Sequence, residues 1–152
     1  MSDPHWTTVL AALLTPTIAI LGSIIAYRQW RIAQNKLKFD LFDRRFAVYD
    51  ATRALLASIM TSGQAKQEEV YKFMAGTRTA KWLLNDDVAQ YIDEVLWHKV
   101  VDLQTLQEEL QGLPVGGERT RNVRAQSEIK KWLLDQFKVL DEKFAPFLSL
   151  SH

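Results

Sequence analysis

The sequence predicts an all-α protein, in which an N-terminal transmembrane helix is continuous with a long helix and precedes a cytosolic bundle of about four helices. Residues 6–27 carry no charged side chain, which is typical of a membrane span. Over the rest of the chain, apolar residues recur at steps of three and four, and no stretch alternates as a strand does. We therefore divide the 152 residues into a tail with the transmembrane helix, residues 1–27, and a cytosolic helical bundle domain, residues 28–152.

The uncharged stretch has the length and the flanks of a span. Its 22 residues, from Trp6 to Tyr27, would extend about 33 Å as a helix, enough for the hydrocarbon core of a bilayer. Trp6 stands at one end, and Tyr27 and Trp30 stand at the other, as aromatic residues do at membrane interfaces. The cations that follow the stretch are Arg28, Arg31, Lys36 and Lys38, and they can also contact anionic lipid headgroups. The positive-inside rule then predicts a single-pass protein in the bilayer, with its N-terminus outside and its C-terminus in the cytoplasm.

Two other interpretations of this stretch are less favoured. A cleaved signal peptide carries its basic residues before the apolar run, whereas here they follow it, and no A-x-A cleavage pattern comes next. A buried core helix is usually shorter than 22 uncharged residues. Neither fits the stretch as well as a span does.

Small side chains form a stripe along one face of the predicted span. They follow one another at steps of four and three, and they are Thr8, Ala12, Thr15, Ala19, Gly22 and Ala26. In lipid, small faces let helix backbones approach closely, so this stripe predicts a self-association seam. Two alternatives stay open: the alignment arises by chance, or the stripe lines a narrow pore in a ring of helices.

Helix formers and turn signals place the remaining elements. The first helix is expected to run on to Ser62, with Gly63 at its C-terminal cap, and a second helix covers about residues 65–75, ended by Gly76. A short turn follows at residues 79–84. Asn85 caps a third helix that reaches about Gln111. The loop at residues 112–117 precedes a fourth helix, residues 119–144.

The sequence holds no catalytic signature, so we expect neither an enzyme nor a bound cofactor. It has no cysteine, which excludes disulfides and thiolate metal sites, and no phosphate loop, paired-histidine motif or serine elbow. One histidine between two acids, Glu94, His98 and Asp102, is too little to predict a metal site. A basic patch has Glu118 and Glu128 interspersed, and its cations are Arg119, Arg121, Arg124, Lys130 and Lys131. A solvated helix face is favoured over RNA binding there, and the net charge is +1, so no nucleic-acid partner is expected.

A cluster of charges follows the predicted membrane segment. Its members are Asp40, Asp43, Arg44 and Arg45. Helical spacing lets Asp40 pair with Arg44 within the chain, which is the ordinary outcome on an exposed helix. The functional alternative is that these charges pair between subunits or with a partner.

With the segments LTPTIAILGSIIAYRQW, NKLKFDLFDRRFAVYDAT and KFAPFL, the chain resembles a family of small bacterial inner-membrane proteins. The most specific part is Leu37 to Tyr49, followed by Trp82 to Val88. The resemblance implies one span in the bacterial inner membrane plus a cytosolic helical domain, and it brings no activity with it. In layout alone, the chain is also similar to the accessory membrane pore protein of type VI CRISPR systems, whose HEPN-like motif it lacks.

Two function hypotheses follow from the sequence. The first is a homo-oligomeric single-pass membrane protein, extending to a channel or pore with a role in defence or stress. The alternative is a membrane-tethered helical adaptor that recruits a cytosolic partner protein.

Overall fold

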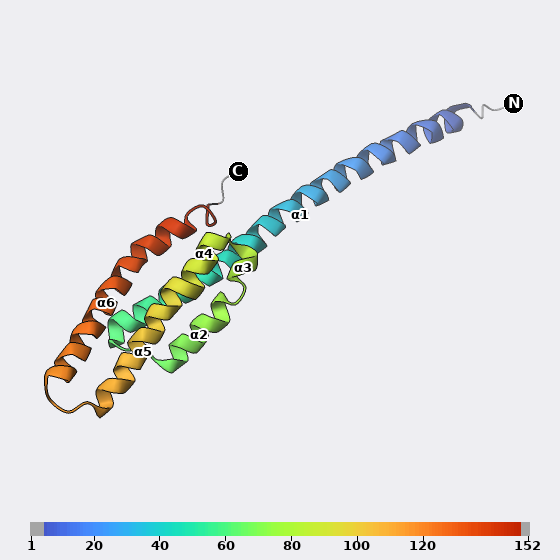
Figure 1. Ribbon diagram of the computed structural model, residues 1–152. Helices are drawn as coiled ribbons and strands as arrows, with labels where there is room; N and C mark the ends of the chain where they lie inside the picture. The colour runs from blue at the N-terminus through green and yellow to red at the C-terminus, as the bar shows by residue number, and fades with distance from the viewer. Residues whose placement is uncertain (1–4, 150–152) are drawn as a thin grey trace. The chain divides into compact units, whose positions relative to one another are not determined.

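A computed structural model describes the backbone of residues 5–149 and the side chains of Trp6, Leu14 and residues 16–149. Every regular element in this part of the chain is helical, which confirms the all-α prediction (Figure 1). The elements are α1 (His5–Ser62), α2 (Gln67–Thr77), α3 (Ala80–Leu83), α4 (Asp86–Gln90), η1 (Tyr91–Leu96), α5 (Trp97–Gly112) and α6 (Gly117–Phe144). The chain divides into two units, Met1–Asp40 and Leu41–His152. The predicted domain boundary after Tyr27 therefore lies inside the first unit.

The first unit, as far as it is described, consists of the N-terminal part of α1. The helix continues through Pro16, although proline offers no N–H for the bond to the preceding turn. All side chains described between Leu14 and Asp40 are exposed. Within the described residues, no helix combines the length and the apolar character that crossing a membrane requires. The side chains of residues 7–13 and of Thr15, which belong to the predicted span, lie outside that description.

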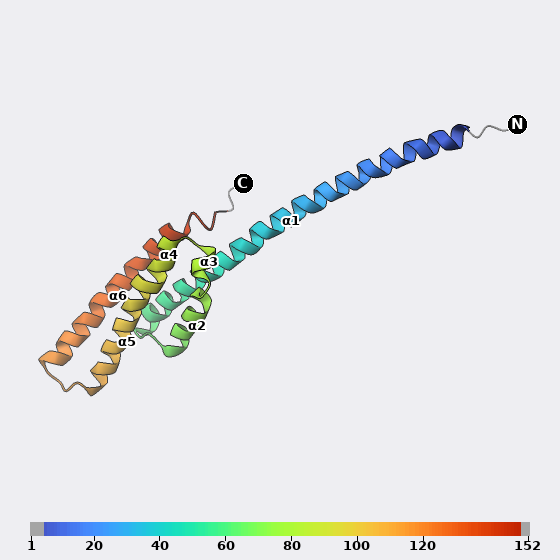
Figure 2. The same ribbon diagram turned by 45° about the vertical axis from the view of Figure 1, so that its right-hand side comes forward.

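The second unit is a helical bundle with one apolar core. Helices α5 and α6 pack side by side as an antiparallel pair, and both views show it (Figures 1 and 2). The largest fully buried side chains come from α1, α4, η1, α5 and α6, and they include Leu55, Ile59, Leu96, Leu103, Leu133 and Phe144. Val48, Leu55 and Ile59, apolar positions that follow the predicted helical period along α1, are buried. The predicted bundle of about four helices is thereby confirmed.

Most element ends match their sequence signals. Helix α1 ends at Ser62, and Gly63 follows it with a φ of 72°, a conformation that glycine adopts without strain. Asn85 caps α4, because its side-chain oxygen accepts a hydrogen bond of 3.0 Å from the N–H of Val88. The predicted third helix is one continuous run of α4, η1 and α5. Its middle, η1, is π-helical, and the N–H of Trp97 bonds back to the carbonyl of Ile92.

The prediction that Gly76 ends the second helix is wrong. Gly76 lies within α2, which continues to Thr77. A Cβ placed on Gly76 would come within 2.5 Å of the Cβ of Ala51 on α1, closer than two carbon atoms can pack. The glycine is needed for the close approach of α1 and α2, and its propensity to break helices is overridden by that packing.

Candidate functional site

Helix α1 in the first unit presents an apolar surface on almost every side. Ile18, Ile20, Leu21, Ile24 and Ile25 are each 48–62 % exposed. At 100° per residue these five side chains spread over about 160° of the helix circumference, and the small residues Ala19, Gly22 and Ala26 lie on the opposite side, so no direction carries a charge. A helix that is apolar around its circumference is stable in a low-dielectric environment and unfavourable in water.

The small face is described over its second half. Ala19, Gly22 and Ala26 are exposed, and no atom lies within 4 Å of a Cβ placed on Gly22. The Ser23 hydroxyl donates a hydrogen bond of 2.8 Å to the carbonyl of Ala19, so this polar group is satisfied within the helix. Thr8, Ala12 and Thr15 belong to the side chains that lie outside the description. The stripe as a seam or as a pore lining stays a prediction.

The residues expected at a membrane interface are exposed. Trp6 is 66 % exposed, and the rings of Tyr27 and Trp30 lie 6.1 Å apart, one turn from each other. The cations beside them, Arg28, Arg31, Lys36 and Lys38, are exposed and form no ion pair within the described chain. Unpaired cations next to aromatic rings are able to bind headgroup phosphates.

The charges after this segment do not behave alike. Asp40, Asp43 and Arg44 are exposed and take part in none of the ion pairs formed by the described residues, so the pair expected between Asp40 and Arg44 is not formed. Arg45 is half-buried; its Nε donates a 3.0 Å hydrogen bond to the carbonyl of Leu83, and its guanidinium lies 5.6 Å from the centre of the Phe147 ring. Arg45 thus holds the second unit together, and the other three charges are free to contact a partner.

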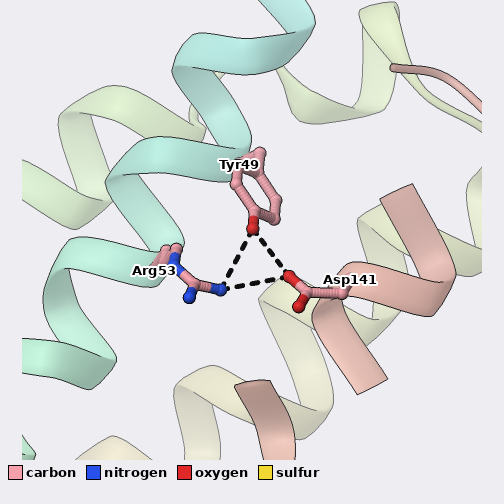
Figure 3. Close-up of polar contacts among 3 residues, drawn as sticks. All are labelled: Tyr49, Arg53 and Asp141. Carbon is pink, nitrogen blue, oxygen red and sulfur yellow. Dashed lines mark hydrogen bonds and ion pairs between the residues drawn. The ribbon is translucent and has the colours of Figure 1, made fainter. Parts of the chain in front are cut away.

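A polar network joins α1 to α6 in the second unit (Figure 3). The Tyr49 hydroxyl donates a 2.6 Å hydrogen bond to Oδ1 of Asp141. Nη1 of Arg53 donates one bond of 3.1 Å to the Tyr49 hydroxyl oxygen and another of 3.1 Å to Oδ1 of Asp141. The Arg53 guanidinium also lies 5.2 Å from the centre of the Phe137 ring. Nothing in the sequence identified this network.

The network has a structural character. Burial, followed by the hydrogen bond and the negative charge of Asp141, raises the pKa of Tyr49, and Arg53 opposes this only in part. The phenol therefore stays protonated as a hydrogen-bond donor and is a poor nucleophile or base. Tyr49, Arg53 and Asp141 accordingly connect α1 with α6.

We expect Asp141→Ala to lower the free energy of unfolding by about 1 kcal/mol, because it removes the acceptor shared by Tyr49 and Arg53. The matched control is Glu142→Ala, the next residue of α6, whose contact with Lys138 is exposed and 3.8 Å long. Urea unfolding of both variants checks the difference. Equal stability of the two variants would contradict the role assigned to the network.

A second network missed by sequence analysis is built around η1. Tyr91 is 6 % exposed, and its hydroxyl donates a 2.9 Å hydrogen bond to Oε1 of Gln136 on α6. The ammonium of Lys143 lies 5.2 Å from the centre of the Tyr91 ring and 2.7 Å from Oδ2 of Asp87. Burial raises the pKa of Tyr91 to about 12.

This raised pKa predicts a loss of stability at alkaline pH. The unfolded phenol releases its proton near pH 10, before the folded one does, so the stabilisation is complete below pH 10 and declines as the pH rises toward 12. We expect a decline of about 2 kcal/mol over this window. Tyr91→Phe removes the titrating group, and urea unfolding between pH 9 and pH 11 should show a flatter profile for this variant. Parallel profiles of the variant and the unchanged chain would contradict the assignment.

The described residues contain no cluster of histidines and carboxylates that could hold a metal ion. Comparisons with families of known proteins, with curated protein sequences and with solved structures find no match to this chain. The resemblance to bacterial inner-membrane proteins therefore stays a prediction from the quoted segments.

Proposed function

We propose that the chain is a homo-oligomeric single-pass membrane protein, anchored by residues 6–27, with the helical bundle on the cytoplasmic side of a bacterial inner membrane. The observation that carries the proposal is the exposed surface of α1 at Leu14 and over residues 16–26, which is mostly apolar and free of charge. Water is an unfavourable solvent for such a surface, and a lipid bilayer is a favourable one. The basic cluster from Arg28 to Lys38 supports the orientation.

Self-association is supported by the contrast between the faces of this helix. Ala19, Gly22 and Ala26 follow one another at steps of three and four, and bulky Ile and Leu side chains cover the other directions. In lipid, bulky side chains gain little by leaving the acyl chains, whereas a small face allows close backbone contact. The face of small residues is therefore the surface on which we place the second copy.

The absence of cysteine permits a direct test by disulfide cross-linking. Single cysteines replace Ala19, Gly22 or Ala26 in the full chain in membranes, and Ile20 and Ile24 provide matched controls on the other faces. We expect oxidised dimers at the three small positions, with cross-linking at the controls lower by about tenfold, because a disulfide requires Cα atoms within about 7 Å.

Two results would contradict this proposal. One is uniform cross-linking at all five positions, which indicates random collision. The other is a monomer by light scattering of the detergent-solubilised protein at micromolar concentration.

A channel is a further step beyond self-association. It predicts leakage from liposomes that Gly22→Leu reduces, because the larger side chain keeps the helices apart or fills the pore.

A membrane-tethered adaptor is the second candidate. It is favoured by the exposed aromatic side chains of the bundle, Trp82 at 77 % and Tyr71 at 73 % exposure, which are residue types that interfaces prefer. Recovery of a stoichiometric partner protein from solubilised membranes, lost on Trp82→Ala and accompanied by a monomeric chain, would favour this candidate over self-association.

A further inference from the structure

The second unit contains a polar groove of about 860 Å³, which the self-association proposal does not use and which shares only Tyr71 with the adaptor candidate. Its walls come from the end of α1, the following loop, α2, α5 and the first half of α6. The volume falls within the range of pockets that enclose small molecules. All of its lining residues belong to the bundle, so the groove can be considered independently of the membrane anchor.

Glutamine side chains fix the shape of this groove. Nε2 of Gln107 donates a 3.0 Å hydrogen bond to the carbonyl of Gly63, and Nε2 of Gln104 donates a 3.2 Å bond to the carbonyl of Ala65. Oε1 of Gln107 accepts a 3.3 Å bond from the N–H of Ala65. The loop between α1 and α2 is thereby attached to α5, and the groove is preorganised for binding.

Cations dominate the charged lining. Lys66, Arg119 and Lys130 face a single carboxylate, that of Glu108. Arg119 already donates hydrogen bonds to the carbonyls of Leu110 and Leu113, at 3.3 and 3.0 Å. Lys66 is exposed, so Lys130 is the less exposed of the two cations that remain.

Lys130 is half-buried and forms neither an ion pair nor a hydrogen bond within the described chain. Its ammonium lies beside the turn after α1, because a Cβ placed on Gly63 would come within 3.5 Å of Nζ. A cation without a counter-ion on the wall of a groove is able to pair with an anionic group of a ligand. Tyr71, on α2, also lines the groove, and this aromatic residue is 73 % exposed.

We infer that this groove binds a phosphate-bearing small molecule with an aromatic base, that is, a nucleotide. The phosphate contacts Lys130 and Lys66, and the base stacks on Tyr71, since every base offers a π-face to an aromatic ring. The exposed amides of Gln64, Gln67 and Gln111 along the same groove supply hydrogen-bond donors and acceptors for the sugar and the base edge. The alternative role of Lys130 is structural, as a cation near the C-terminal end of α1.

Calorimetric titration of the full chain in detergent tests the inference, with AMP and inorganic pyrophosphate as probes. We expect both to bind saturably, AMP with a dissociation constant below about 1 mM. Lys130→Gln should weaken both by about tenfold or more, and Tyr71→Leu should weaken AMP alone. Lys131→Gln is the matched control, because Lys131 is the adjacent cation of α6 and is exposed outside the groove; it should leave both affinities unchanged.

Three results would overturn the nucleotide site. The first is the absence of saturable binding of either probe at millimolar concentration. The second is an equal loss for Lys130→Gln and Lys131→Gln, which reveals unspecific attraction to positive charge. The third is a destabilised Lys130→Gln variant that binds like the unchanged chain, which assigns Lys130 the structural role. None of them depends on whether the protein self-associates, so this test and the cross-linking test fail separately.

Discussion

The double substitution Leu21→Arg/Ile24→Arg is expected to release the protein from the membrane. Both side chains are exposed on the uncharged part of α1, at 55 % and 48 %. On insertion scales, replacing an apolar residue by arginine at the centre of a span costs about 3 kcal/mol, so that the two changes together oppose insertion by about 6 kcal/mol. Extraction of membranes with alkaline carbonate, followed by flotation, measures the fraction that remains integrated.

The matched control places two arginines at the same spacing of three residues, but after the predicted span. Gln29→Arg/Ile32→Arg changes exposed positions among the native cations, where added positive charge favours the cytoplasmic side. This variant should float with the membranes as the unchanged protein does. If Leu21→Arg/Ile24→Arg resists carbonate equally well, or if the unchanged chain stays in the supernatant, residues 6–27 are not an anchor and the proposed function is lost.

Local signals in the sequence were sufficient for most of the element boundaries. Gly63 adopts the left-handed conformation that ends α1, and the Asn85 side chain bonds to a free N–H at the start of α4. Both features depend on residues within a few positions of each other, and their chemistry is readable from the sequence. The buried face of α1 was likewise predicted, because its period follows directly from helix geometry.

Features that depend on distant segments could not be predicted. Tyr49 and Asp141 are 92 residues apart, and neither has a neighbour in the sequence that reveals the contact. The π-helical turn of η1 has no compositional signature, and the groove around Lys130 requires α1, α2, α5 and α6 to be placed first.

At Gly76, helix packing is expected to make a glycine-to-alanine substitution destabilising, although this substitution usually stabilises a helix. In an exposed helix, replacing glycine by alanine stabilises by about 1 kcal/mol, because alanine restricts the unfolded chain and favours the helix. At Gly76 the added methyl group would meet Ala51 at 2.5 Å, so α1 and α2 would have to separate. We expect Gly76→Ala to destabilise the bundle by about 2 kcal/mol, the usual effect of overpacking, and thermal or urea unfolding measures it.

A compensating change separates this explanation from a general intolerance of α2 to substitution. Ala51→Gly removes the methyl group on α1 that the added methyl group of Gly76→Ala would meet. The double variant Gly76→Ala/Ala51→Gly should therefore recover most of the stability lost by Gly76→Ala alone. The recovery is incomplete because glycine in α1 itself costs about 1 kcal/mol. Gly112→Ala is the control at a helical glycine with open space around it, and it should be neutral or slightly stabilising. If the double variant is less stable than Gly76→Ala alone, the two helices do not meet through this pair. Residues in direct contact show coupled effects on stability, whereas the effects of independent sites simply add.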